Sequence, residues 1–226
     1  MKLLKNEWLQ ILILAAPFCA AAILWDQLPE RMPSHWNIRG EIDGYAGKTF
    51  GALFLPVLNV ILVLLCLVLP RLDPKSRNYD VETKASIAGV FKVCRLAFSL
   101  FCGAVAIATY LVALHYPLDL TRLLIGGLGL MLAVMGNSMT KLRPNSFAGF
   151  RTPWSLGSRT VWLRTHRLGG RLMVGCGLAL FLESLFLPAW LYFLAGVLPL
   201  ILLVGVVPVA YSYFSFKAEQ KASTHL

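Results

Sequence analysis

Glu183 is the single charged side chain in residues 172–216, which read LMVGCGLALFLESLFLPAWLYFLAGVLPLILLVGVVPVAYSYFSF. A bilayer core about 30 Å thick is crossed by roughly 20 apolar helical residues, so this stretch is too long for one span. We expect Pro188 to divide it into a tight hairpin of two transmembrane helices, because proline interrupts a helix. The stretch therefore predicts an integral membrane protein.

Four further apolar runs precede this stretch, at residues 8–25, 50–69, 96–114 and 123–139. We expect Lys92 and Arg95, just before the third run, to extend their long side chains to the membrane interface. The chain is 58% hydrophobic and 14% charged, whereas soluble proteins average about 45–50% and about 25%. A soluble enzyme and a disordered chain are therefore excluded. The predicted fold is all-α, a bundle of six transmembrane helices.

Basic residues are distributed unequally between the two sides of this bundle. Of the 21 lysines and arginines, 17 fall in the two termini and in the connections after the second and fourth spans. The positive-inside rule places that side in the cytoplasm, so both termini are expected there. The net charge of +10 therefore reflects membrane orientation, and we predict no direct contact with nucleic acid.

The connection between the first two spans lies on the outer side and reads LPERMPSHWNIRGEIDGYAGK, residues 28–48. Two prolines and three glycines predict specific turns around a polar and aromatic centre, His35, Trp36 and Asn37. This centre is either a turn at the membrane interface or a binding surface for an external ligand. His35, Glu41 and Asp43 also have zinc-ligand chemistry, so a metal-dependent enzyme or transporter is the alternative function. No other cofactor is predicted.

The connection after the fourth span, residues 140–171, carries seven basic residues and no acidic one. We expect a short amphipathic helix that begins at a Ser158 cap, places Trp162 and His166 on one face and ends at Gly169–Gly170. Its charge predicts contact with anionic lipid at the cytoplasmic face. The aromatic side chains of this loop, including Trp154, also favour a protein partner.

Polar residues inside predicted spans are candidates for a functional role. Asn59, Asn137 and Glu183 are the three that we single out. Counting along the helix places Glu183 in the outer half of the membrane, where water or Arg122 is expected to satisfy it.

Two groups of motifs resemble known bacterial membrane families. Pro33-Ser34-His35-Trp36-Asn37, Gly40 and Asp43-Gly44-Tyr45 are similar to the signature of a membrane domain of unknown function. Residues 136–139 (GNSM), 143–145 (RPN), 149–156 (GFRTPWSL) and 162–170 (WLRTHRLGG) resemble the SdpI immunity-protein family. We accordingly expect a two-helix unit at residues 1–70 and an SdpI-like four-helix unit at residues 71–226.

This resemblance implies a six-span protein of the bacterial inner membrane that protects against a secreted antimicrobial peptide. It further implies signalling, in which a small DNA-binding repressor is held at the membrane. Toxin sensing is expected to involve His35, Trp36, Asn37, Gly40, Asp43, Gly44 and Tyr45. The cytoplasmic partner is expected to contact Asn145, Gly149, Arg151, Thr152, Pro153, Trp154, Trp162 and His166. The sequence contains no H-E-x-x-H or G-x-S-x-G motif, so we do not predict an enzyme.

Overall fold

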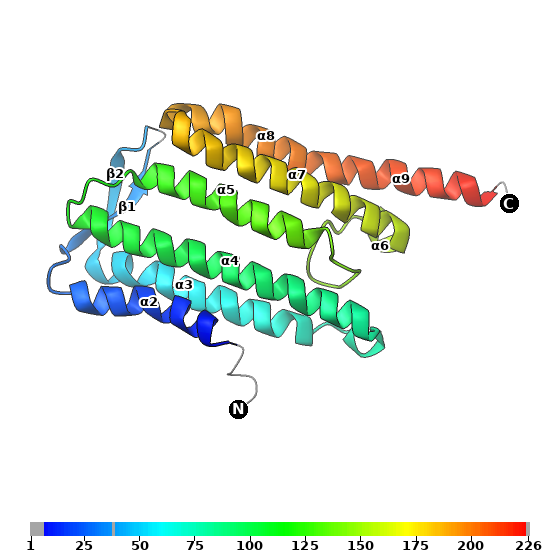
Figure 1. The fold of residues 1–226 in the computed structure, drawn as a ribbon, viewed down its shortest axis with the longest axis horizontal. Coiled ribbons are helices and arrows are strands. Elements are labelled where there is room, and N and C mark those ends of the chain that lie inside the picture. The colour runs from blue at the N-terminus through cyan, green and yellow to red at the C-terminus, as the bar shows by residue number, and fades with distance from the viewer. Residues whose placement is uncertain (1–6, 38, 225–226) are drawn as a thin grey trace.

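The computed structural model describes residues 7–37 and 39–224 of the chain. It is an elongated helical bundle with a two-stranded hairpin at one end (Figure 1). The short helix α6 (Pro153–Gly157) and residues 140–152 lie at the opposite end. We call these the hairpin end and the loop end of the bundle.

The long helices run along the bundle axis. They are α2 (Trp8–Leu24), α3 (Lys48–Val68), α4 (Val81–Ala113), α5 (Leu120–Met139), α7 (Arg159–Phe186) and α9 (Val207–Thr224). Helix α3 continues into the 3-10 turn η1 (Leu69–Arg71), and η2 (Ser76–Asn78) lies in the connection to α4. Helix α9 is preceded without a break by η3 (Ala189–Leu191), η4 (Phe193–Val197), α8 (Leu198–Leu200) and η5 (Ile201–Val206). The predicted break at Pro188 is confirmed, since α7 ends before it and Ala189–Ala222 forms the next rod.

Within residues 7–37 and 39–224, five helical segments are long and apolar enough to cross a membrane, which supports the predicted helical membrane protein. They are Lys48–Arg71, Val81–Ala113, Leu120–Met139, Arg159–Phe186 and Ala189–Ala222. Helix α2 is apolar but has 17 residues, or about 26 Å at 1.5 Å per residue. That length is less than the roughly 30 Å of a hydrocarbon core. The count of six spans and the cytoplasmic position of the termini stay predictions.

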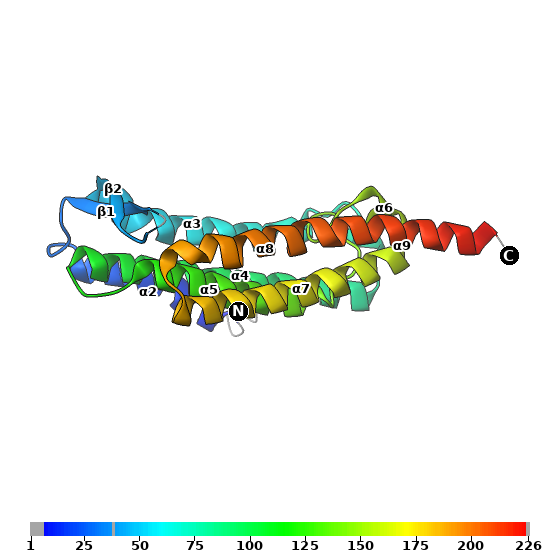
Figure 2. The ribbon, with the colours of Figure 1, turned by 90° about the horizontal axis from the view of Figure 1, so that it is seen from above.

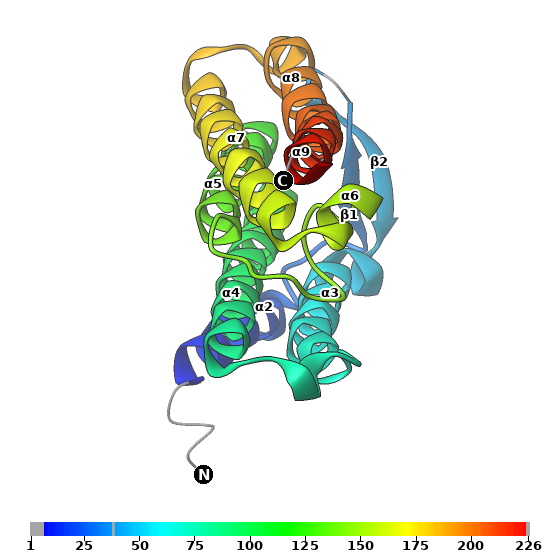
Figure 3. The same cartoon turned by 90° about the vertical axis from the view of Figure 1, so that its right-hand side faces the viewer.

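The helices form two layers. Helices α2, α4, α5 and α7 lie in one layer, and α3, α8 and α9 lie in the other (Figures 2 and 3). The hairpin closes one end of the second layer, and α6 packs on α7 and α9 at the other end. Helix α4 is the longest and contacts α2, α3 and α5.

Helices α5 and α7 approach so closely that glycine is required where they touch. A Cβ on Gly129 would lie 2.5 Å from the Gly177 carbonyl oxygen. A Cβ on Gly170 would lie 2.6 Å from the Gly136 carbonyl oxygen. The prediction that a short helix ends at Gly169–Gly170 is wrong, because these glycines permit packing and α7 continues through them. The predicted Ser158 cap is confirmed, since its hydroxyl accepts from the Val161 N–H at 3.3 Å.

The predicted outer connection is a β-hairpin, which the expected all-helical fold did not include. Strand β1 (Arg31–Trp36) pairs antiparallel with β2 (Ile42–Gly47). Met32 of β1 is fully buried in a core with Ala52 of α3 and Tyr110 of α4. The Tyr110 hydroxyl also donates to the Ala52 carbonyl at 2.5 Å. Packing of Met32 against the helices thus stabilises strands whose sequence is poor in β-branched residues.

Arg95 lies inside the bundle, so the prediction that it extends to the membrane interface is wrong. Its guanidinium forms an ion pair with Glu7, and the residue is 6% exposed. One turn away, Ser99 accepts a hydrogen bond on its hydroxyl from Gln10 at 2.6 Å. The Ser99 carbonyl accepts from Asn59 at 3.3 Å. These contacts join α2, α3 and α4 through polar groups.

Candidate functional site

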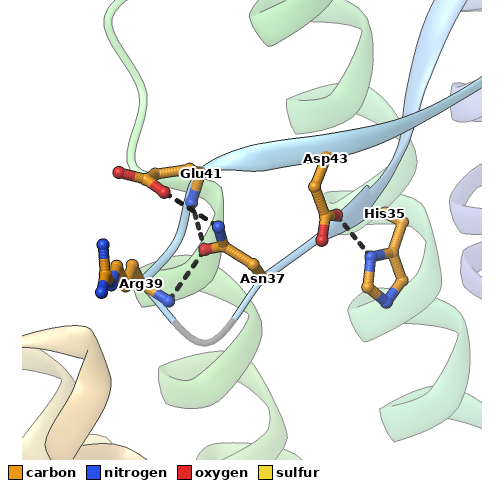
Figure 4. Close-up of polar contacts among 5 residues, drawn as sticks. All are labelled: His35, Asn37, Arg39, Glu41 and Asp43. Carbon is orange, nitrogen blue, oxygen red and sulfur yellow. Dashed lines mark hydrogen bonds and ion pairs between the residues drawn. The ribbon is translucent and has the colours of Figure 1, made fainter.

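Asn37 organises the turn that joins the two strands of the hairpin (Figure 4). Its side-chain oxygen accepts from the backbone N–H groups of Arg39 and Glu41 at 2.9 and 3.1 Å. Its side-chain nitrogen donates to the Glu41 carboxylate at 2.9 Å. Gly40 has a φ of +83°, a conformation that glycine adopts at little cost. Asn37 and Gly40 therefore stabilise the turn of the hairpin. The polar atoms of the Asn37 side chain are already hydrogen-bonded within this turn.

His35 and Asp43 form an exposed polar pair on the hairpin (Figure 4). The His35 Nδ1 and Asp43 Oδ1 atoms lie 2.5 Å apart, and the side chains are 71% and 44% exposed. A Cβ on Gly44 would lie 2.8 Å from the His35 Cβ. Glycine at this position therefore gives His35 the space that it occupies. The pair presents a hydrogen-bonding surface to the solvent.

Two aromatic residues extend this surface. Tyr45 is 52% exposed, and the Arg31 guanidinium lies 5.8 Å from its ring centroid. Trp36 is half-buried at the end of β1. The hairpin thus combines a hydrogen-bonded polar pair, an exposed ring and a cation, which suits recognition of a peptide.

The hairpin separates two of the proposed zinc ligands from the third. Asp43 lies against His35, whereas Glu41 is hydrogen-bonded to Asn37 on the far side of the turn (Figure 4). Among the described residues, no group of three or more His, Cys, Asp or Glu side chains is placed to hold a metal. The proposed ligand set is therefore not assembled in this conformation.

An apolar groove of about 820 Å³ is lined by α4, α5 and α7 and extends along α5 from Asp119 to Val134. Phe101, Gly127 and Phe181 line its wall, and Asp119 and Arg122 lie at its end. The two charged groups pair at 3.4 Å, and both are about half exposed. The hairpin turn lies at the same end of α5, because a Cβ on Gly40 would lie 3.1 Å from the hydroxyl of Thr121, which does not itself line the groove. The hairpin turn and one end of the groove therefore both lie at the start of α5.

The loop end is organised by Asn145, which is 6% exposed. Its side-chain oxygen accepts from the N–H groups of Phe147 and Ala148 at 2.9 and 2.7 Å. Its nitrogen donates to the carbonyls of Arg143 and Ala148 at 3.1 and 3.2 Å. Asn145 is therefore a loop-shaping residue in this structure.

Asp73 anchors the same loop from the connection between α3 and α4. Its carboxylate accepts from the Ser146 N–H at 3.0 Å, the Ser146 hydroxyl at 2.7 Å, the Lys75 N–H at 2.9 Å and the Tyr79 hydroxyl at 2.9 Å. Burial by itself would raise the pKa of Asp73, but these hydrogen bonds outweigh it and lower the pKa below the ordinary 3.8. The carboxylate is thus held ionised as a clamp on the loop.

Trp162 and His166 are fully buried beneath the loop. Their rings stack with centroids 4.1 Å apart, and the Trp162 indole N–H donates to the Leu142 carbonyl at 2.9 Å. His166 accepts the Phe150 N–H on Nε2 at 2.9 Å, and its Nδ1 lies 2.8 Å from the Trp162 carbonyl. Gly149 has a φ of +105°, and any Cβ there would overlap the His166 ring. Gly149, Trp162 and His166, all from the family motifs, therefore position the loop.

Thr152 and Pro153 begin α6, and Trp154 attaches it to α9. The Thr152 hydroxyl accepts from the Ser155 N–H at 3.1 Å and lies 2.8 Å from the Ser212 hydroxyl of α9. The Trp154 ring meets Tyr213 of α9 edge-on, with centroids 5.1 Å apart. Arg151 is exposed. Of the eight predicted partner residues, Gly149, Arg151 and Pro153 are exposed, Trp154 is half-buried and the other four are buried.

Several residues that hold the loop were not singled out from the sequence. They are Asp73, Ser146, Ser155, Ser212 and the ion pair between Glu82 and Arg143. The Thr152–x–x–Ser155 spacing is typical of a helix N-cap, so this contact could have been predicted from the local sequence. The contact of Asp73 could not be predicted from the local sequence, because its partner Ser146 is 73 residues away.

The three predicted intramembrane residues lie in different places. Asn59 is fully buried, and Asn137 is exposed near the end of α5. Glu183 packs against Gly196 of η4, and its Oε2 has no hydrogen-bond partner among the described residues. Arg122, the expected partner of Glu183, pairs with Asp119 instead. The structure therefore does not join these residues into one pathway.

Comparison with known proteins supports the motifs of both units. Residues 12–60 match a domain of unknown function, DUF1648, and residues 141–212 match the SdpI/YfhL protein family. The predicted resemblance to the SdpI family is confirmed. The chain is 26% identical to "Immunity protein SdpI" of Bacillus subtilis (strain 168) over 211 residues, 93% of this chain and 97% of that protein. No solved structure matches the chain.

Proposed function

We propose that this chain is an immunity protein of the bacterial inner membrane that protects against a secreted antimicrobial peptide. The observation that carries the proposal is similarity to a curated immunity protein along nearly the full length of both chains. The apolar helices fit a membrane location. Similarity to an immunity protein favours a non-enzymatic role, and protection by binding requires no cofactor.

The hairpin end is proposed to face the outside of the cell and the loop end to face the cytoplasm. Residues 140–171 at the loop end carry seven basic residues and no acidic one, which favours the cytoplasmic side. The hairpin end carries Glu30, Glu41, Asp43 and Asp119. In this orientation both termini are cytoplasmic, and the units 1–70 and 71–226 each contribute to both faces.

The toxin is proposed to bind the hairpin and the adjacent groove together. His35, Asp43 and Tyr45 supply polar and aromatic contacts on the exposed hairpin. The groove between α4 and α5 supplies an apolar surface at membrane depth. A peptide that acts on membranes has both kinds of surface, so a composite site matches its chemistry.

Signalling to a cytoplasmic repressor is proposed to pass through α4. Near the hairpin, Tyr110 of α4 packs in one core with Met32. Near the loop, Ile87 of α4 packs in another core with Trp162. The Ser86 hydroxyl also donates to the Lys141 carbonyl at 2.7 Å. One continuous helix therefore contacts both ends, and a shift of α4 would reach Arg151 and Trp154, where we place the repressor.

Survival of a toxin-sensitive bacterium that expresses the chain tests this proposal. Wild type is expected to protect, and His35→Ala is expected to lose most protection because the exposed pair is removed. Arg151→Ala changes an exposed residue at the opposite end and is the matched control, which should still protect. Membrane levels of all three proteins must be equal.

A wild-type chain that protects against no such peptide would contradict the immunity function. Protection by His35→Ala equal to wild type would contradict the hairpin site but leave immunity standing. In cells that also carry the repressor and a reporter, Arg151→Ala is expected to protect without relieving repression. A normal reporter response in that variant would contradict the placement of the repressor.

A further inference from the structure

A cavity of about 430 Å³ opens between α5 and α7 near the loop end. Asn137 and Thr140 line it from α5, and Arg167, Arg171 and Val174 line it from α7. The lining includes two cations, an amide and a hydroxyl but no carboxylate. This donor set is suited to a phosphate group, which accepts hydrogen bonds from arginine and neutral donors.

Neither guanidinium is neutralised by the rest of the described chain. Arg167 and Arg171 are exposed, and within residues 7–37 and 39–224 neither has an ion-pair or hydrogen-bond partner. The two residues are four apart on α7 and so share one face. Arg95 and Arg143, by contrast, pair with Glu7 and Glu82. Two adjacent unpaired cations attract an anion.

The glycine contact between the helices brings this donor set together. Any Cβ on Gly170 would collide with the Gly136 carbonyl and with Thr140. Because both positions are glycine, α5 and α7 approach closely beside Asn137, Arg167 and Arg171. The family motif in residues 162–170 includes Arg167 and Gly170, and the proposed toxin and repressor sites use neither. The motif therefore contains two residues to which the immunity proposal assigns no role.

Exposed apolar side chains beside the cavity indicate that the anion belongs to a lipid. On the hairpin side of Arg171, the surface of α7 continues through Val174, which lines the cavity, and Leu178, which is 47% exposed. Val134 of α5, 50% exposed, lies one turn before Asn137. Exposed apolar side chains directly beside the cation pair match the acyl chains and headgroup of one phospholipid.

We propose that the cavity binds the phosphate of an anionic phospholipid, such as phosphatidylglycerol, from the leaflet at the loop end. Arg167 and Arg171 hold the phosphate, Asn137 and Thr140 donate to its oxygens, and the acyl chains lie along Val134 and Leu178. The lipid thereby ties α5 to α7 where residues 140–158 leave α5 and return to α7. This site is independent of toxin binding and does not require the proposed function.

Native mass spectrometry of the purified full chain in detergent tests the site. Phosphatidylglycerol and phosphatidylcholine with identical acyl chains are titrated separately. One phosphatidylglycerol per chain is expected to bind at least about tenfold more tightly than phosphatidylcholine. Both lipids carry the phosphate, but the choline ammonium cancels its charge and is repelled by the two arginines. The double variant Arg167→Gln/Arg171→Gln is expected to lose this preference.

The control is Arg159→Gln/Arg164→Gln, which removes the same charge from exposed positions of α7 outside the cavity and should keep the preference. Asn137→Leu retains both cations and should weaken phosphatidylglycerol binding several-fold. Equal loss in both double variants would overturn the site in favour of general electrostatic attraction. Equal binding of the two lipids by wild type would also overturn it. Displacement of the lipid by millimolar glycerol phosphate would show a soluble-phosphate site and contradict the lipid assignment.

Discussion

At the scale of single residues, Asp73 accepts four hydrogen bonds and fixes the loop that carries the family motif. We predict that Asp73→Asn loosens residues 143–152, because bonds to a carboxylate contribute about 1.5–3 kcal/mol each. Hydrogen exchange of those residues in purified protein should rise about tenfold or more. Asp119→Asn removes a carboxylate at the hairpin end and should leave exchange in the loop unchanged, which serves as the control.

The same clamp predicts a pH dependence. The pKa of Asp73 is lower in the folded chain than its ordinary value of 3.8. The contribution of the ionised Asp73 to the stability of the loop is therefore fully present above about pH 4. It is lost as the pH falls through the lower pKa of the folded chain. Exchange in residues 143–152, corrected for the intrinsic effect of pH, should rise below pH 3.8 in wild type. Asp73→Asn should show no such rise, and an identical rise in that variant would contradict the clamp.

The structure gives some of the residues singled out from the sequence a role that the sequence did not indicate. Trp162 and His166 were predicted to contact a partner, but both are fully buried and hold the loop. Aromatic and polar character alone cannot separate a contact residue from a positioning residue, because burial depends on the tertiary fold. Asp73 was missed because it is 73 residues away from Ser146 in the chain.

At the scale of secondary structure elements, the glycines of α5 and α7 control how closely the helices pack. A Cβ on Gly129 would lie 2.5 Å from a carbonyl of α7, whereas a Cβ on Gly175 meets nothing within 4 Å. We predict that Gly129→Leu destabilises the protein by about 1–3 kcal/mol or more, as overpacking does. Gly175→Leu should be near neutral. Thermal unfolding in detergent measures both, and equal melting temperatures for the two variants would contradict this packing.

The long apolar elements were predictable because the bilayer imposes a length and a composition that appear directly in the sequence. The break at Pro188 followed from the same argument. The strands around His35 and Asp43 were not predictable, since their pairing depends on burial of Met32 against α3 and α4. The continuity of α7 was missed because Gly169–Gly170 are typical of a helix end, while here they serve contact with α5.

At the scale of the whole molecule, the orientation is a prediction that cysteine labelling can test. We expect Arg39→Cys at the hairpin end to react with a membrane-impermeant maleimide in intact cells. Arg151→Cys at the loop end should react only after the membrane is opened. The background lacks the native cysteines, Cys19, Cys66, Cys94, Cys102 and Cys176. The opposite labelling pattern would reverse the proposed topology.

Direct contact between toxin and hairpin is the central claim, and photo-crosslinking measures it. A photoreactive amino acid is placed at Tyr45 of the hairpin or at Arg151 of the loop end, and cells are exposed to a peptide against which the chain protects. We predict a crosslinked adduct at position 45 and none at position 151. An adduct at position 151 alone, or protection without any adduct at position 45, would contradict the account.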